Sequence, residues 1–293
     1  DYDGSTYVEL FYISSGTTLE TQKEKFNEAL NNFVNNATMY SSEYEREKYV
    51  NDYIISNCVY DDEAAYNNNT KGNVSTAYGV LVDGKAICEG YARAFQLLCN
   101  KLGIECVSIA GMTDDVGHEW NCAKIDGNWY QVDVTWNDSQ DDFSNYYYFN
   151  LTDEQMYSSH RADDLFDEIE PDNYNNDENL IGNLYVPECN STEYNYYNQT
   201  APILYAFDEE NDNTISNALA NSAVNGDNYF NIIVDDSLDF EDAYSTLVQD
   251  GYVVNYIESA NNMLWGEVEL DTSSYAYKND TLRVITIVLN YIN

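Results

Sequence analysis

Residues 88–136 constrain the fold of this chain more than any other segment. An apolar stripe with steps of three and four predicts one helix that is buried along one face, and Gly103 follows where such a helix commonly ends. The stripe consists of Cys88, Tyr91, Ala92, Phe95, Leu98, Cys99 and Leu102. Three alternating segments come next, 105–112, 118–125 and 128–136, and the hairpin signal Asp126-Gly127 separates the last two. The pattern therefore predicts a buried helix followed by antiparallel strands.

The segments before this core are predicted to be mainly helical. A strand pattern covers 7–13, and a helical pattern opens at Thr18. A second helix follows Ser42, where Glu45 three residues on completes a capping box. We expect these elements to pack against the core and not to carry chemistry.

The segments after the core predict a second domain. Residues 163–180 are rich in Asp, Glu and Asn, as a solvated connection would be. The tail then predicts helices at 214–223 and 240–250 and strands at 229–234, 263–270 and 281–291. We therefore expect a first domain at 1–165, a linker at 166–180 and a smaller α/β domain at 181–293.

The charge of the chain excludes several kinds of partner. It has 12 Lys+Arg against 52 Asp+Glu and a net charge of -40 at pH 7, which repels phosphate groups, so we expect no nucleic acid partner. No apolar run approaches the roughly 18 residues of a transmembrane segment. The chain begins with Asp1, and few Lys with abundant Asn and Tyr are typical of a secreted or cell-surface bacterial protein. We expect an extracellular or cell-surface location, with a signal segment absent from the printed sequence.

The cysteines and histidines do not form a metal-binding pattern. Six cysteines without a C-x-x-C pair, and two histidines, complete no zinc motif, and the acidic clusters lack the calcium-loop spacing, so we expect no metal. His160 is interpreted as structural. The remaining thiols are interpreted as core residues or disulfide partners; they are Cys58, Cys99, Cys106, Cys122 and Cys189.

Cys88 is the candidate nucleophile. It stands at the start of the predicted helix, where unpaired backbone N–H groups stabilise a thiolate and can hold an oxyanion. Free cysteine is also among the most buried residue types, so Cys88 could simply begin the buried stripe.

His118 and Asp133 favour the catalytic reading of Cys88. A two-residue turn at Asp126-Gly127 places Trp120 opposite Asp133 and His118 opposite Thr135, so His118 and Asp133 become diagonal neighbours on one sheet face. A carboxylate there can accept the ring N–H and leave the other nitrogen for a thiol. The alternative is a surface histidine beside a solvated Asp.

Three segments carry a resemblance to a known family. The sequences DGKAICEGYARAF at 83–95, HEWN at 118–121 and WYQVDVTWND at 129–138 resemble the transglutaminase-like superfamily, including bacterial members often described as cysteine proteases. The resemblance covers about residues 45–160. It implies a papain-like α+β core with a Cys-His-Asp triad at Cys88, His118 and Asp133, in a catalytic domain at 1–165.

The resemblance also suggests residues around the triad. It implies Tyr78 as an oxyanion or substrate-side residue, although Tyr78 could equally be a packed core aromatic. Trp120 and Trp136 match aromatic positions near the cleft, although a Trp at a strand end is more often packing.

The function that follows is thiol-dependent acyl transfer at amide bonds, without a cofactor. Water as acceptor makes the enzyme a peptidase or amidase, and a lysine amine makes it a protein transglutaminase. The expected substrate is a protein or peptide, lysine-rich or associated with the cell wall. The alternative is a catalytically silent cell-surface binding or scaffolding module on the same fold.

Overall fold

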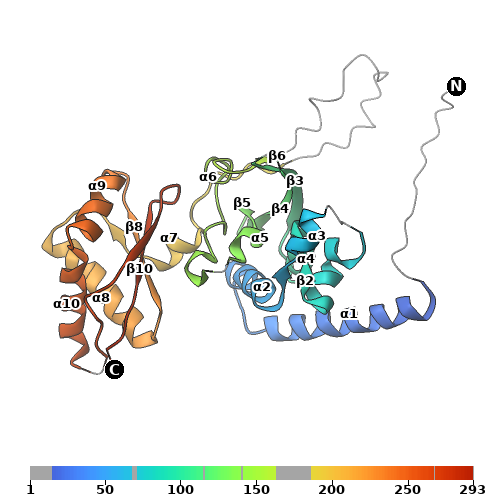
Figure 1. The fold of residues 1–293 in the computed structure, drawn as a ribbon, viewed down its shortest axis with the longest axis horizontal. Helices are drawn as coiled ribbons and strands as arrows, with labels where there is room; N and C mark the ends of the chain where they lie inside the picture. Colours follow the sequence, from blue (N-terminus) through green and yellow to red (C-terminus); the bar gives the residue numbers. More distant parts are fainter. Residues whose placement is uncertain are drawn as a thin grey trace, which may run out of the picture. The chain divides into compact units, whose positions relative to one another are not determined.

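The computed structural model describes residues 15–67, 71–114, 116–139, 141–162, 186–266 and 268–292 (Figure 1). The chain forms two compact units. The first comprises Asp1–Gly127, Asp133–Asp138 and Arg161–Val186, and the second comprises Asn128–Val132, Ser139–His160 and Pro187–Asn293. The predicted strand at 7–13 and linker at 166–180 lie outside the described residues, and the domain division at 165 and 181 stays a prediction. None of the described helices is long and apolar enough to cross a membrane.

Two helices open the first unit, as predicted. They are α1 (Gly16–Ala37) and α2 (Glu43–Asn57). The capping box of α2 is present, because the Glu45 N–H donates to the Ser42 hydroxyl at 3.1 Å and the Ser42 N–H donates to the Glu45 carboxylate at 3.0 Å. Phe33 of α1 is fully buried, and its ring lies 5.0 Å from Tyr49 and 4.9 Å from Tyr53 of α2. This aromatic contact joins the two helices.

A short parallel pair leads the chain into the helix that begins at Cys88. Strand β1 (Val59–Tyr60) pairs with β2 (Lys85–Ala86), and α4 (Cys88–Lys101) follows. Between the two strands lie α3 (Asp62–Tyr66), a 3-10 turn (Asn73–Ser75) and a π-helical turn (Gly79–Asp83). The predicted stripe of α4 is buried from Tyr91 to Cys99, and Gly103 beyond its end has a φ of +82°. The predicted helix is therefore confirmed.

An antiparallel sheet follows α4, in the strand order β5-β4-β3-β6. Its strands are β3 (Cys106–Thr113), β4 (Val116–Ile125), β5 (Asn128–Val132) and β6 (Arg161–Ala162). In the register of β3 with β4, Gly111 lies opposite His118 and Ile109 lies opposite Trp120. Helix and antiparallel sheet together confirm the predicted α+β class.

The predicted strand at 128–136 is wrong in its second half. Strand β5 ends at Val132, and the four-residue helix α5 (Val134–Asn137) takes its place. The reason is Asp133, whose carboxylate accepts hydrogen bonds from the N–H groups of Thr135 and Trp136 and so caps the new helix.

The second unit contains a mixed sheet with the strand order β7-β8-β10-β9. Strands β7 (Ile203–Leu204) and β8 (Tyr229–Val234) are parallel and joined by α8 (Glu209–Asn225), while β10 (Val284–Val288) runs antiparallel to β8 and to β9 (Ala276–Asn279). The unit also contains the short helices α6 (Asp153–Met156), α7 (Tyr196–Thr200) and α9 (Phe240–Tyr244), the last continued by a π-helical turn (Ser245–Gln249). The predicted strand at 229–234 is confirmed, and β10 is buried on both faces, as expected within 281–291.

The predicted strand at 263–270 is wrong. Helix α10 (Val253–Leu264) ends inside this range, and Leu270 makes only an isolated bridge to Tyr291. The helix forms because apolar residues at helical spacing are buried together in the core of the second unit. They are Val253, Tyr256, Ile257, Ala260 and Leu264.

We predict that Gly90→Ala destabilises the first unit. A Cβ at Gly90 would lie 2.5 Å from the Val74 carbonyl oxygen and 2.7 Å from the Ala86 Cβ, so α4 would have to move away from the turn and strand beneath it. We expect a loss of about 1–3 kcal/mol in the free energy of unfolding, measured by urea denaturation. Gly117→Ala is the control, because no atom lies within 4 Å of its added Cβ. Equal stabilities of the two variants would contradict the packing argument.

Candidate functional site

Cys88 is the first residue of α4 and the most accessible thiol in the chain. Ile87 precedes it in an extended conformation and provides no side-chain cap for the first turn. All six cysteines lie in the described ranges and are free thiols; Cys88 is half-buried and the other five are buried. A reagent in solution therefore meets Cys88 before any other thiol.

Cys88 and His118 line the same cavity, which has a volume of about 390 Å³. This volume lies within the range of about 300–1,000 Å³ that is usual for small-molecule sites. The titratable residues of the lining are Tyr60, Cys88, Glu89, His118 and Glu119. One thiol, one imidazole, one phenol and two carboxyl groups thus line the same cavity.

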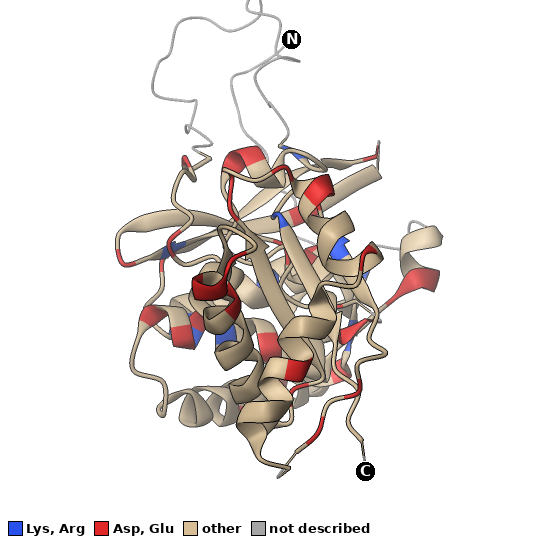
Figure 2. Cartoon of the chain, turned by 90° about the vertical axis from the view of Figure 1, so that its left-hand side faces the viewer, with Lys and Arg blue, Asp and Glu red and all other residues tan. Residues whose placement is uncertain are grey.

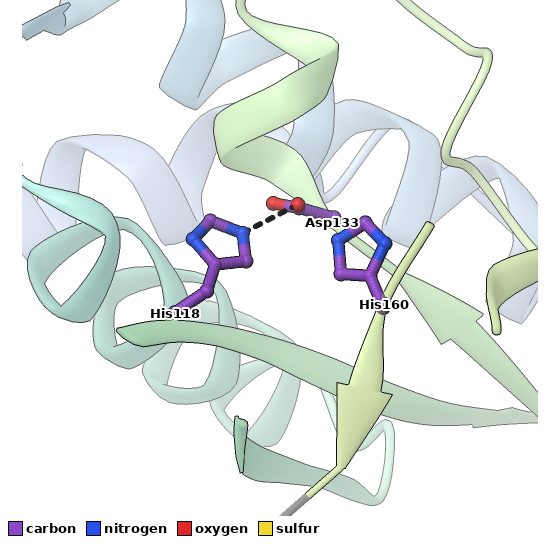
Figure 3. Close-up of side chains that lie close together, drawn as sticks. All are labelled: His118, Asp133 and His160. Carbon is purple, nitrogen blue, oxygen red and sulfur yellow. Dashed lines mark hydrogen bonds and ion pairs between the residues drawn. The ribbon is translucent and has the colours of Figure 1, made fainter. Parts of the chain in front are cut away.

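His118 is held by a buried hydrogen bond to Asp133, as the sequence predicts. Nε2 of the ring lies 2.7 Å from Oδ2 of Asp133, and the two residues are 8% and 0% exposed (Figure 3). The other carboxylate oxygen, Oδ1, accepts hydrogen bonds from the N–H groups of Thr135 at 2.9 Å and Trp136 at 3.2 Å. Because Nε2 is bound to Asp133, Nδ1 is the ring nitrogen left for a sulfur atom.

Two tryptophans restrict the orientation of the His118 ring. The Trp120 ring is stacked at 6.2 Å and 20°, and the Trp136 ring lies at 5.9 Å and 45°. Gly111, opposite His118 in β3, is required by this packing, because a Cβ there would lie 2.6 Å from the Trp120 ring. Both tryptophans suggested by the resemblance therefore contact the imidazole, and Trp120 does so while fully buried.

The surroundings of His118 favour its charged form. Burial lowers the pKa of the ring, but the charge and hydrogen bond of Asp133, together with the hydrogen bond and charge of Cys88, raise the pKa from 6.5 to about 10. The ring is consequently an imidazolium at neutral pH. The Cys88 side chain therefore lies close enough to the ring to affect its pKa.

The sequence indicated Tyr78 beside this site, whereas Tyr60 is the tyrosine that lines the cavity. Tyr78 stacks on Phe26 of α1, with ring centroids 6.1 Å apart, and is not among the lining residues. Tyr60 lies close enough to the backbone of Cys88 for that backbone to affect the pKa of its hydroxyl. No local pattern marks it, because the pairing of β1 with β2 brings it there across 25 residues of chain. The role suggested for Tyr78 stays a prediction.

His160 has contacts that a structural role explains. It is 3% exposed, its Nδ1 lies 2.8 Å from the Ser159 hydroxyl, and its ring lies 5.6 Å from Tyr148. His118, Asp133 and His160 are of types that can ligate a metal ion, and all three are drawn in Figure 3. The hydrogen bond between His118 and Asp133 explains that pair without an ion, and we assign no metal.

We predict that the stability contributed by His118 decreases as the pH rises. A folded-state pKa raised to about 10 stabilises the fold fully below the ordinary pKa of 6.5, and this contribution is lost between about pH 6.5 and 10. The difference in the free energy of unfolding between wild type and His118→Gln should therefore shrink over that interval. Urea denaturation at a series of pH values measures it.

A double-variant comparison is the control for this prediction. In an Asp133→Asn background, His118→Gln should lose most of its pH dependence, because the carboxylate that holds the proton on the ring is gone. A difference that stays constant or grows toward pH 10 would contradict the proposed charge state.

Comparison with known proteins finds similarity to one family over part of the chain. Residues 31–134 match the family model of the transglutaminase core, described as the transglutaminase-like superfamily. The Kyphoscoliosis peptidase of Mus musculus is 28% identical over 175 residues, which are 56% of this chain and 26% of that protein. The Kyphoscoliosis peptidase of Homo sapiens is 27% identical over 146 residues, 46% of this chain and 22% of that protein. The chain thus spans about a quarter of the length of these curated relatives.

Two solved structures are also similar over part of the chain. A structure described as a TGase has a TM-score of 0.36 and 20% identity, over 44% of this chain and 35% of that one. A candidate cysteine protease from Cytophaga hutchinsonii has a TM-score of 0.30 and 19% identity, over 39% of this chain and 37% of that one. The matched region 31–134 contains Cys88, His118 and Asp133. Over residues 31–134, the chain therefore has a core similar to that of the transglutaminase-like superfamily.

Proposed function

We propose that the chain is a cysteine-dependent acyl-transfer enzyme that acts on amide bonds, as a peptidase, an amidase or a protein transglutaminase. The observation that carries the proposal is the placement of His118. Its ring is fixed by buried Asp133, lies close enough to the Cys88 side chain for that side chain to raise its pKa, and lines the same cavity as that half-buried thiol. The match of residues 31–134 to the transglutaminase-like superfamily supports thiol-dependent catalysis in general.

The proposed reaction proceeds in two steps. The sulfur of Cys88 attacks the carbonyl carbon of the amide, the C–N bond breaks, and the His118 imidazolium gives its proton to the departing amine. The product is a thioester on Cys88. In the second step, neutral His118 takes a proton from water or from an amine as that acceptor attacks the thioester, the C–S bond breaks, and the sulfur of Cys88 leaves as a thiolate. Asp133 orients the ring and stabilises its charge throughout.

Two donors can stabilise the oxyanion of the tetrahedral intermediates. One is the backbone N–H of Cys88 at the start of α4, and the other is the hydroxyl of Tyr60. Burial, and next the charge of the neighbouring Cys88, raises the pKa of Tyr60 to about 12, so its hydroxyl keeps its proton at neutral pH and can donate. We propose this role for Tyr60.

The acidic side chains that line the cavity of Cys88 favour cationic groups on a substrate. Glu89 and Glu119 line it beside Cys88, and its lining residues include neither lysine nor arginine. The ribbon in Figure 2 likewise carries many more acidic than basic residues. These charges support a protein or peptide substrate that presents lysine. Association with the cell wall and an extracellular or cell-surface location stay predictions.

We predict that iodoacetamide alkylates Cys88 selectively and rapidly at pH 6. The other five thiols are buried, and burial raises the pKa of Cys58 to about 11. His118→Ala should slow the alkylation of Cys88 at least about tenfold, because the sulfur loses the neighbouring imidazolium. Mass spectrometry of the digested protein identifies the labelled residue.

Two comparisons decide this experiment. Cys88→Ala should abolish the rapid phase and so confirm the labelled site. If wild type and His118→Ala react at the same rate, the thiol is not activated, and the binding or scaffolding alternative becomes the better reading.

We predict that Tyr60→Phe lowers turnover about 10- to 100-fold, since one hydroxyl is removed from the proposed oxyanion site. Incubation with a casein-like protein and a labelled amine measures turnover, because it reports both peptide cleavage and amine incorporation. Tyr78→Phe is the matched control and should leave turnover nearly unchanged, since that ring packs on Phe26. Loss of turnover in Tyr78→Phe alone would reverse the two assignments.

A further inference from the structure

A second cavity, of about 650 Å³, lies within the second unit. Five aromatic residues from three separate segments line it: Phe143, Tyr146, Tyr196, Tyr229 and Phe230. None of its lining residues lines the cavity of Cys88. The proposed acyl-transfer chemistry uses none of these residues.

Phe230 is buried, whereas the other four aromatic rings of this second cavity are half-buried and pack against neighbouring rings. The Tyr146 and Tyr196 rings are nearly parallel, with centroids 3.8 Å apart and an angle of 9°. Phe143 stacks on Tyr277 at 4.0 Å and meets Tyr229 edge to face at 5.9 Å. Rings fixed by other rings lose little freedom when a ligand packs against them, so this wall is preorganised.

The rest of the lining is polar and mostly neutral. Four asparagine side chains at the end of α8, in the turn after it and in β8 provide both donors and acceptors. They are Asn221, Asn225, Asn228 and Asn231. Ser222 and Thr200 add hydroxyl groups. The charged lining residues are two carboxylates, Asp142 and Asp227, and neither lysine nor arginine is among them. An anionic ligand would meet only repulsion.

We propose that this cavity binds a neutral carbohydrate. A pyranose has apolar C–H faces that pack on aromatic rings and a rim of hydroxyl groups that pair with amides and carboxylates. The cavity supplies both kinds of surface, and its volume lies in the range of about 300–1,000 Å³ that is usual for ligand sites. The second unit would then hold the chain on a glycan, independently of the chemistry at Cys88.

Other ligand classes fit this lining less well. A purely apolar ligand would leave the amides and carboxylates of the cavity without partners when it displaced water. A lysine-rich peptide would be attracted by Asp142 and Asp227, but its ammonium groups would not need the four asparagine amides and the aromatic rings that make up most of the lining. The experiment includes both anionic and cationic probes for this reason.

Calorimetry with the full chain tests the proposal. The neutral probes are cello-, xylo-, manno- and chito-hexaose, and the charged probes are galacturonic acid hexamer and hexalysine. At least one neutral hexasaccharide should bind with a Kd below about 1 mM, and the anionic hexamer should not bind. Tyr196→Ala should weaken this binding at least about tenfold, through the loss of one stacking surface.

Further variants keep the result interpretable. Asn225 and Asn228 are exposed, so Asn225→Ala and the cavity-filling Asn228→Trp should fold normally, as circular dichroism checks, and should also weaken binding. Tyr205→Ala is the matched control, since Tyr205 is 54% exposed in the same unit and does not line the cavity. Cys88→Ala should bind as wild type does, which separates this proposal from the acyl-transfer proposal. Binding of hexalysine alone, no binding of any neutral probe, or binding insensitive to the cavity variants would overturn the proposal.

Discussion

The buried hydrogen bond between His118 and Asp133 is the interaction on which the arrangement around Cys88 depends. A carboxylate that is 0% exposed is costly unless its oxygens are paired, and here the imidazole and two backbone N–H groups supply the partners. The same side chain therefore ends one strand, begins α5 and fixes the ring. Helix capping and orientation of the imidazole are two consequences of one buried charge.

The second constraint is the close packing at the start of α4. Gly90 allows the Val74 carbonyl and Ala86 to approach the first turn, and the parallel pair of β1 with β2 places Tyr60 beside Cys88. This packing leaves one sulfur half-buried in a cavity, while the five other thiols are buried. A thiol with a charged ring beside it and an opening to solvent has the surroundings that cysteine nucleophiles require.

The sequence predicted those helices and strands that bury one face, or both faces, along most of their length. The stripe of α4, the capping box of α2 and the strand at 229–234 are examples, because each signal lies within about 15 residues. The failures occurred where two signals competed. Apolar residues at 263–270 were interpreted as a strand, although they continue from a helical stripe that starts at Val253, and the capping tendency of Asp133 overrode the alternation of 128–136.

The sequence by itself determined which residue types were available for the site, since Cys88, His118 and Asp133 are local features of a helix start, a strand and the end of a hairpin. Only the tertiary structure decided that Tyr60 and not Tyr78 lines the cavity, and that both Trp120 and Trp136 contact the imidazole. It also decided that aromatic residues from three distant segments line a second cavity. The physical reason is that periodicity reports which face of an element is buried, whereas the partner on that face depends on pairings that close long loops and leave no local pattern.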